Sequence, residues 1–358
     1  MKDDVKNWPL RIAMVSPLFE SVPPQLYGGT ERVVSYLTEE LVRQGHEVVL
    51  YASGDSQTAA ELRPATPRGL RLDPLCRDPI AYHMTMLDQV SRAASEFDVL
   101  HFNTDYLHFP LVRRLPRPSL TTLHGRLDLR DLVPLYRHFD DLPLISISDA
   151  QRAPLPWVNW LATVYHGLPE DLYRLQPEPG SYLAFVGRMS REKGPDHAIE
   201  IARRAGLPLK MAAKVDDECR DYYEAKVKPL LDGPGVEYIG EIGETEKPAF
   251  LGGAIALLFP IVWPEPFGLA MIEAMACGTP VIAWRQGSVA EVVDEGVTGY
   301  IAEDLAGAVA AVAKAVGHDR AACRRAFERR FTAARMARDY VAAYRSLLQP
   351  QRVLAGEA

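Results

Sequence analysis

One stretch of this chain combines a loop, a short helix and a strand: Trp263-Pro-Glu-Pro-Phe-Gly-Leu-Ala-Met-Ile-Glu-Ala-Met-Ala-Cys-Gly-Thr-Pro-Val-Ile-Ala283. The apolar run 254–260 precedes it and predicts a buried strand. Two prolines bias the loop toward extended backbone, so a helix is expected to begin near Gly268 and to end at Gly278. Glu265 then lies on the loop and Glu273 on the helix.

The start of this helix is a candidate binding site. The amides of Phe267, Gly268 and Leu269 have no partner inside the helix, so they offer donors and a partial positive charge to an anion or a polyol. Small residues surround Glu273 on the helix and leave room for a ligand. A lone glutamate is usually a solvated surface residue. In this almost wholly apolar flank, however, a carboxylate needs a partner, and ligand hydroxyls would serve.

Glu265 and Glu273, with seven residues between them, resemble the paired-glutamate motif of the family 4 retaining glycosyltransferases of the GT-B fold. The flanking residues, from Pro264 to Leu269 and from Glu273 to Ala283, are similar to that family at nearly every position. The resemblance implies that the first glutamate and the amides after it hold the donor sugar. It also implies that the second glutamate holds the nucleotide ribose.

The beginning of the chain predicts a strand, a helix and a second strand, over 11–16, 30–44 and 47–52, which indicates a parallel sheet. The loop between the first strand and the helix contains Tyr27-Gly28-Gly29-Thr30, with Thr30 as the expected helix N-cap. Paired glycines let the backbone approach a phosphate, but they also serve ordinary tight turns. By resemblance, Gly28 and Gly29 contact the donor phosphate or the acceptor.

Four more strand-like runs follow in the first half, over 98–103, 119–124, 142–148 and 161–166. Ligands of parallel sheets bind beyond the carboxyl ends of the strands. The polar residues at those ends are therefore candidates: Asn103, Asp105 and Ser148 on the acceptor side, and His124, which resembles the family's histidine at the sugar site. A single histidine after a strand is more often structural. Val164-Tyr-His-Gly167 resembles the family's Asn-Gly segment, with His166 in place of the usual asparagine.

The second half begins with the other informative motif, Phe185-Val-Gly-Arg-Met-Ser-Arg-Glu-Lys-Gly194. Arg188 ends a predicted strand and Lys193 lies on the loop before a helix, so both cations can face a cleft. A solvated pair of cations is the plain alternative. The segment is similar to the family's Gly-Arg and Lys-Gly motif, whose cations hold the donor diphosphate. Further strands are expected at 209–213 and 236–240, with helices at 196–204 and 220–231.

Composition and charge disfavour several classes of function. With 358 residues, 47% of them hydrophobic, the chain can bury two cores. A net charge of -7 disfavours nucleic-acid binding. The four cysteines have no metal-ligand spacing, and Asp216 and Asp217 are interpreted as helix caps, so no metal or other cofactor is expected. No run is long and apolar enough for a transmembrane segment, and we expect a cytoplasmic protein.

These observations predict an α/β protein of GT-B architecture, with two doubly wound Rossmann-like domains facing a deep cleft. We expect an acceptor-side domain over 1–167, a nucleotide-sugar donor domain over 168–331, and a last helix within 332–358 that crosses back to the first domain. The resemblance implies retaining transfer of a hexose from a nucleotide diphosphate sugar, with UDP slightly favoured over GDP, and we expect this transfer to need no metal. The acceptor would be a small molecule, a glycan or a lipid-linked molecule. The alternatives are another GT-B activity, such as an epimerase or a phosphorylase, and a non-catalytic nucleotide-sugar-binding protein. The residues that the resemblance assigns to catalysis are His124, Arg188, Lys193 and Glu265.

Overall fold

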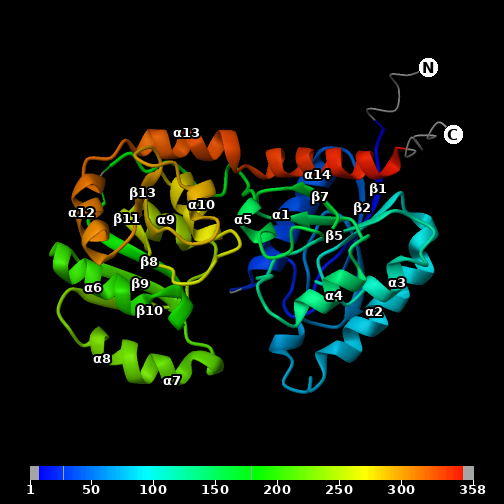
Figure 1. The fold of residues 1–358 in the computed structure, drawn as a ribbon, viewed down its shortest axis with the longest axis horizontal. Coiled ribbons are helices and arrows are strands. Elements are labelled where there is room, and N and C mark those ends of the chain that lie inside the picture. Colours follow the sequence, from blue (N-terminus) through cyan, green and yellow to red (C-terminus); the bar gives the residue numbers. More distant parts are fainter. Residues whose placement is uncertain (1–7, 27, 179, 350–358) are drawn as a thin grey trace.

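The computed structural model describes residues 8–26, 28–178 and 180–349, which form two lobes side by side (Figure 1). The first lobe contains a seven-stranded sheet in the order β3-β2-β1-β4-β5-β6-β7, and every neighbouring pair of strands is parallel. Its strands are β1 (Arg11–Val15), β2 (Glu47–Ser53), β3 (Glu61–Thr66), β4 (Val99–Phe102), β5 (Ser119–Thr122), β6 (Leu144–Ser146) and β7 (Trp160–Thr163).

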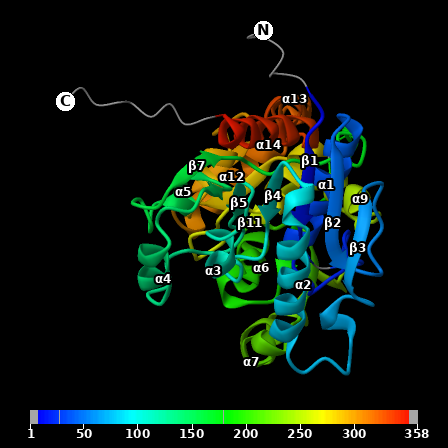
Figure 2. The same ribbon diagram turned by 90° about the vertical axis from the view of Figure 1, so that its right-hand side faces the viewer.

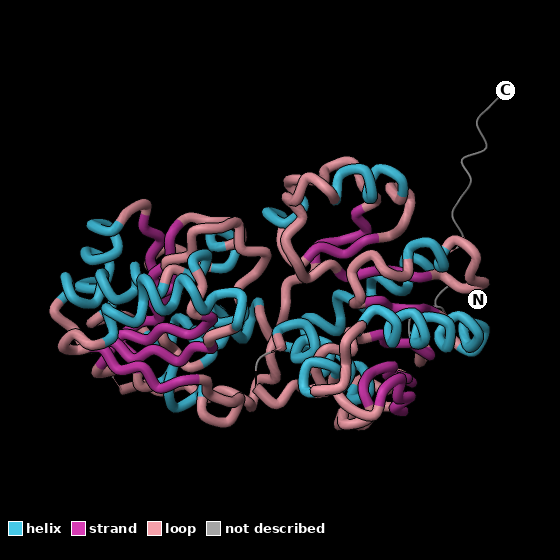
Figure 3. The backbone as a smooth tube through the Cα atoms, turned by 90° about the horizontal axis from the view of Figure 1, so that it is seen from below, coloured by secondary structure: helices cyan, strands magenta, loops and turns pink. Residues whose placement is uncertain are grey.

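The second lobe contains a six-stranded parallel sheet in the order β10-β9-β8-β11-β12-β13. Seen from below, the two sheets are separate, one in each lobe (Figure 3). The strands of this sheet are β8 (Tyr182–Arg188), β9 (Leu209–Lys214), β10 (Val236–Gly240), β11 (Ala254–Phe259), β12 (Val281–Trp284) and β13 (Gly299–Ala302).

Helices cover both faces of each sheet. In the first lobe, α1 packs on one face, while α2, α3 and α4 cover the outer face that is turned toward the viewer in Figure 2. The helices of this lobe are α1 (Gly29–Arg43), η2 (Leu70–Leu72), α2 (Pro79–Ala93), η3 (Ala94–Glu96), α3 (Phe109–Val112), α4 (Leu132–His138) and α5 (Asp149–Arg152). Those of the second lobe are η4 (Arg191–Lys193), α6 (Pro195–Ala205), η5 (Asp217–Cys219), α7 (Arg220–Tyr222), η6 (Tyr223–Val227), α8 (Lys228–Leu231), α9 (Lys247–Gly252), α10 (Leu269–Ala276), α11 (Val289–Val292), α12 (Leu305–Ala315) and α13 (Arg320–Arg330). Two doubly wound parallel sheets confirm the expected fold class.

The last helix, α14 (Ala333–Leu348), leaves the second lobe and packs on α1 of the first (Figure 1). A buried polar network fixes it there. The hydroxyl of Tyr344 lies 2.7 Å from Nδ1 of His101, whose Nε2 lies 2.8 Å from the Thr122 hydroxyl, and that hydroxyl lies 2.9 Å from the hydroxyl of Tyr340. The expected first domain (1–167) and last segment (332–358) each include residues outside the described ones, namely 1–7 and 350–358.

The chain crosses between the lobes at two places that contact each other. Leu168 donates its amide to the carbonyl of Phe331 at 2.9 Å and accepts the amide of Ala333 at 2.7 Å. The backbones come so close that a Cβ atom on Gly167 would lie 2.3 Å from the carbonyl oxygen of Thr332. Only glycine fits this approach. The apolar core on this side also runs without interruption from one lobe to the other.

Two local features were not predicted. The helix expected over 220–231 has those limits, but it contains a π-helical turn, Tyr223–Val227, because Pro229 has no amide proton and its ring would clash with the carbonyl four residues earlier. Strand β3 was not predicted, since its sequence contains Pro64 and few apolar residues. Such a strand is tolerated at the edge of a sheet, which is where β3 lies. In the described parts of the chain, no helix has both the length and the hydropathy needed to cross a bilayer.

Candidate functional site

The strand order of each sheet reverses its direction of winding at one point, and the two reversal points face each other. In the first sheet this point lies between β1 and β4, and in the second it lies between β8 and β11. Such points leave a crevice beyond the carboxyl ends of the strands. A cavity of about 480 Å³ lies there, between the lobes, and its walls include the loops after these four strands.

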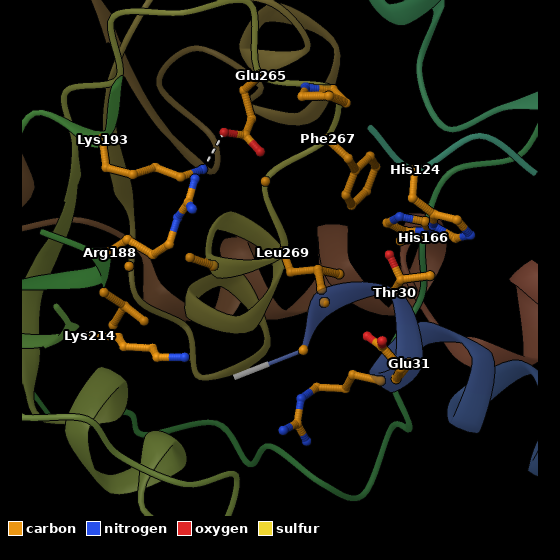
Figure 4. Close-up of a pocket in the computed structure, with 18 of the residues that line it drawn as sticks. Thr30, Glu31, His124, His166, Arg188, Lys193, Lys214, Glu265, Phe267 and Leu269 are labelled. Carbon is orange, nitrogen blue, oxygen red and sulfur yellow. Dashed lines mark hydrogen bonds and ion pairs between the residues drawn. The ribbon is translucent and has the colours of Figure 1, made fainter. Parts of the chain in front are cut away.

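Three side chains from the loops after β8 and β11 meet on the wall formed by the second lobe. Lys193 donates a hydrogen bond to Oε2 of Glu265 at 2.5 Å, and the indole of Trp263 donates to the same oxygen at 2.8 Å. Figure 4 shows Lys193 and Glu265 pointing toward each other across the cavity wall. Among the described residues, Oε1 of Glu265 receives no hydrogen bond. That oxygen is therefore available to a ligand hydroxyl.

Helix α10 begins beside this carboxylate with an uncapped N-terminus. Gly268 stands at the N-cap with a φ of 83°, and no side chain bonds to the first amides. A Cβ atom on Gly268 would lie 2.9 Å from the ring of Phe259, so both the backbone angle and the space require glycine. Leu269 and Ala270, in the first turn, line the cavity. The free amides and the helix dipole can thus receive an anion or a sugar hydroxyl.

Arg188 and Lys214 extend this wall at the carboxyl ends of β8 and β9, and both line the cavity. Arg188 donates to Glu192 at 2.7 Å and lies 3.7 Å from Oδ2 of Asp216. The other carboxylate oxygen of Asp216 pairs with Lys214 at 3.0 Å. The expected capping role of Asp216 is wrong, because its side chain makes no cap bond and pairs with these cations instead. Together with Lys193, these two residues place three cations on one wall of the cavity, each paired with a carboxylate.

Glu273 is almost fully buried, with 1% of its surface exposed, and it also lines the cavity. Lys247, at the start of α9, donates a hydrogen bond to its Oε1 at 2.8 Å. The partner that this buried carboxylate requires is therefore a lysine of the same lobe, 26 residues earlier in the chain. The sequence offered no signal for this pair, because the two residues lie on different helices.

The opposite wall begins at α1. The expected N-cap, Thr30, is wrong: the helix begins at Gly29, with Gly28 at the cap position, and no side chain caps it. Gly28, Gly29, Thr30 and Glu31 all line the cavity, so the first turn of α1 faces the first turn of α10. Tyr27, the first residue of the quoted motif, lies outside the described residues. Burial raises the pKa of Glu31 to about 7.

His124 stands on this wall, beyond the end of β5. Its Nε2 lies 2.8 Å from Oδ1 of Asn103, and its ring stacks on that of His166 with centroids 5.4 Å apart. His166 in turn contacts the ring of Phe267, from the loop of the second lobe, at 4.8 Å. Figure 4 shows the three rings side by side at the cavity. Burial lowers the pKa of His124 to about 4, so its imidazole is neutral at physiological pH.

The acceptor-side candidates divide into two groups. Asn103 and Asp105 line the cavity, and Asp105 has a left-handed backbone with a φ of 49°, which aspartate tolerates better than most residues. Ser148 does not line the cavity. Its hydroxyl accepts the amide of Gln151 at 3.0 Å and so caps α5. Apart from Ser148, all the residues that the sequence singled out for the site line this cavity.

Two sets of contacts join the lobes, and the sequence predicted neither. Arg32 on α1 donates to Glu244 of the second lobe at 2.6 Å, and the hydroxyl of Tyr36 makes a short hydrogen bond to the same oxygen. On the other side, the carboxylate of Glu291 accepts the amides of Asp149 and Ala150 at 2.7 Å each. These partners lie more than 140 residues apart, so only the arrangement of the lobes reveals them.

Comparison with known proteins gives two family matches, one for each half. Residues 174–329 match the family model "Glycosyl transferases group 1", and residues 27–165 match "Glycosyltransferase Family 4". The chain is 27% identical to a glycogen synthase of Mycobacterium tuberculosis, over 96% of this chain and 97% of that protein. It is 35% identical to an alpha-maltose-1-phosphate synthase of the same species, over 40% of each.

Solved structures of similar fold cover nearly the whole chain. AviGT4, a glycosyltransferase involved in avilamycin A biosynthesis, has a TM-score of 0.74 and 26% identity, and the match covers 95% of this chain and 98% of that one. A sucrose-phosphate synthase from Thermosynechococcus elongatus has a TM-score of 0.77 over 94% of this chain and 99% of that one. Its 20% identity shows likeness of fold alone.

Proposed function

The chain belongs to the family 4 glycosyltransferases of the GT-B fold, and from this premise we propose that it transfers a hexose from a nucleotide diphosphate sugar to an acceptor hydroxyl, with retention of anomeric configuration. The observation that carries the proposal is the wall on which Lys193, Arg188, Glu265 and the uncapped start of α10 meet. Cations and free amides at one point suit a diphosphate, and an adjacent carboxylate suits the sugar hydroxyls.

In this proposal the leaving diphosphate is stabilised by charge. As the bond between sugar and phosphate breaks, negative charge grows on the phosphate oxygen. Arg188, Lys193 and the amides of α10 stabilise this charge. Glu265 orients the sugar through Oε1 while Trp263 holds Oε2. Glu273, held by Lys247, accepts a ribose hydroxyl of the nucleotide. The acceptor enters along the opposite wall, where Asn103 and Asp105 lie.

We propose a UDP-sugar as the donor in preference to a GDP-sugar, and a small molecule, a glycan or a lipid-linked molecule as the acceptor. A thermal-shift screen of nucleotides and nucleotide sugars tests the donor. A ligand present at 100 times its dissociation constant should stabilise the folded protein by about 2.7 kcal/mol. Stabilisation by neither UDP nor GDP compounds would contradict the donor class.

Product analysis then separates this proposal from its alternatives. The best donor is incubated with a panel of acceptors, and the products are followed by NMR spectroscopy. Transfer with the anomeric configuration of the donor is the expected result. An epimerised sugar, cleavage that requires phosphate, or binding without turnover would instead indicate the epimerase, the phosphorylase or the non-catalytic protein. An inverted product would contradict retention.

We also propose that transfer needs no metal ion. Two lysines, an arginine and a helix N-terminus stand at the cavity wall, and a diphosphate would compete with the carboxylates that now pair with these cations. Their charge would then replace the charge that a divalent cation supplies in other enzymes. Transfer rates measured with a chelator and with added magnesium or manganese should agree. Loss of transfer with the chelator and its return only with a metal would contradict this proposal.

A further inference from the structure

His166 occupies an unusual position for a histidine. Only 4% of its surface is exposed, it lines the cavity, and its ring makes no hydrogen bond with any described residue. Its contacts are instead with two aromatic rings. The face of His124 stacks on it with an interplanar angle of 17°, and the ring of Phe267 meets it nearly edge-on, at 67°. His166 therefore contacts both His124 of the first lobe and Phe267 of the second.

The hydrogen bonds of Asn103 determine which nitrogen of His124 carries the proton. The amide nitrogen Nδ2 of Asn103 lies 3.3 Å from the carbonyl oxygen of Val15, where only a donor is favourable. The amide oxygen of Asn103 consequently faces Nε2 of His124 and can only accept. A neutral imidazole has one protonated nitrogen, so Nε2 is protonated and Nδ1 keeps its lone pair.

The lone pair on Nδ1 of His124 has no partner. This atom is buried and, within the described residues, lies near no donor. A buried acceptor without a donor costs free energy. His124 lines the ligand cavity, and a sugar hydroxyl that reaches Nδ1 would remove that cost. The direction of the lone pair depends on the plane of the ring, which is held by the hydrogen bond to Asn103 at one nitrogen and by the stacked ring of His166 along its face.

We propose that His166 is a positioning residue for His124: its ring holds the imidazole of His124 in the plane that presents Nδ1 to a hydroxyl of the bound sugar. The sugar-binding part of this inference rests on the proposed function. An asparagine at this position, which the resemblance makes usual, would behave differently. Its amide could donate to Nδ1 of His124 and would provide no ring to stack on.

Hydrogen exchange tests the positioning without any substrate. In protein with 15N-labelled histidine, NMR spectroscopy follows the solvent exchange of the ring N–H of His124, with His124→Phe used to assign its signal. His166→Ala should exchange this proton at least tenfold faster than the wild type, since the ring plane is then released. His166→Phe keeps a stacking ring and should stay within about twofold of the wild type.

The chain contains matched internal controls. His101 and His108 are buried histidines of the same lobe with hydrogen bonds at both ring nitrogens, and neither contacts the ring of His166. Their exchange should be unchanged in His166→Ala. Equal exchange of the His124 proton in the wild type and His166→Ala would overturn the proposal. So would faster exchange at all three histidines, because that indicates general loosening of the lobe.

A double-mutant cycle tests the consequence for transfer. Loss of one hydrogen bond to the sugar should lower kcat/KM about threefold to tenfold in His166→Ala. In the His124→Phe background the same change should have almost no further effect, because His166 acts through His124. Independent, multiplying losses would overturn the proposal. If no transfer is found at all, the proposed function fails, while the exchange experiment still decides whether His166 positions His124.

Discussion

Lys193 is the residue whose partner must change when a donor binds. In the structure it pairs with Glu265, and both side chains are mostly buried, with 16% and 11% exposed. A diphosphate in the cavity would compete for the ammonium group. Because negative charge on the diphosphate grows as the sugar departs, the contact to Lys193 should be stronger in the transition state than in the bound donor.

Substitution of the two cations should therefore lower kcat as well as donor affinity. We expect Lys193→Ala and Arg188→Ala each to lose about ten- to a hundredfold in rate, since a charge-assisted hydrogen bond contributes roughly 1.5 to 3 kcal/mol. Glu273→Ala should act mainly on the donor KM, because a ribose contact is remote from the breaking bond. Lys210→Ala, whose lysine pairs with Glu237 outside the cavity, is the control. An unchanged kcat in Lys193→Ala with loss of kcat in Glu273→Ala would refute these roles.

Glu31 should make the stability of the protein depend on pH. Its pKa rises from 4.5 to about 7 on folding because the carboxyl group is buried. Below pH 4.5 both states hold the proton. Between pH 4.5 and 7 only the unfolded state loses it, so the free energy of unfolding falls as pH rises, by about 3 kcal/mol in total.

Glu31→Gln should remove this dependence. Urea unfolding of the wild type and the variant at pH 5 and pH 8 measures it, and Glu47→Gln, which changes an exposed carboxylate of the same lobe, is the control. The variant should gain stability relative to the wild type at pH 8 and little at pH 5. The same difference between the two proteins at both values would show that Glu31 does not titrate in this range.

At the scale of single elements, the hydroxyl of Tyr344 contributes to the docking of α14. It bonds to the fully buried His101, whose pKa burial lowers to about 3, so the imidazole remains neutral. Tyr344→Phe would leave a buried ring nitrogen without its partner, at a cost of about 1 to 3 kcal/mol. Denaturant unfolding should show this loss. Tyr82→Phe, on the exposed face of α2, should show almost none, and equal losses would mean that the network contributes nothing specific.

The elements themselves were largely predictable from the sequence. Strand β10 has its expected limits and β8 ends at Arg188 as expected, because apolar residues and neighbouring glycines define both strands locally. The uncapped start of α10 was also predictable, since Gly268 and the prolines before it stop any earlier helix. Strand β3 was not, because it is held by pairing at a sheet edge and not by its own composition.

The site was predictable where its residues follow strands in the chain, and not where the two lobes meet. Arg188, Lys193 and Glu265 belong to loops after β8 and β11, which the topology of a parallel sheet must bring to one edge. The pairing of Arg32 with Glu244 depends on how one lobe sits on the other. Local sequence patterns do not predict that arrangement. The same holds for the stack of His166 on His124.

At the scale of the whole molecule, two sets of side-chain contacts hold the lobes in the arrangement that the structure shows. Glu244 binds Arg32 and Tyr36 on one side of the cavity, and Glu291 binds the start of α5 and the hydroxyl of Tyr165 on the other. Opening about the crossings near Gly167 and Thr332 would separate both carboxylates from their partners. Donor binding between the lobes should favour the closed arrangement, and the contacts of Glu244 and Glu291 should stabilise the same arrangement.

Glu244→Ala should shift the free protein toward an open arrangement. Arg32 is 3% exposed in this arrangement, so removing its carboxylate leaves a buried cation that, among the described residues, bonds only to the carbonyls of Pro24 and Leu26, and opening would hydrate it. A loss of about 1.5 to 3 kcal/mol from the closed state corresponds to a ten- to hundredfold change in the ratio of closed to open molecules. Small-angle X-ray scattering should show a larger radius of gyration for this variant without donor. Saturating donor should return the radius of gyration toward the wild-type value, and the apparent donor affinity of the variant should be weaker.

Glu303→Ala breaks an exposed pair with Arg285 within the second lobe and should change neither the radius of gyration nor the donor affinity. A Glu244→Ala protein with wild-type dimensions and wild-type donor affinity would show that this pair does not hold the lobes together.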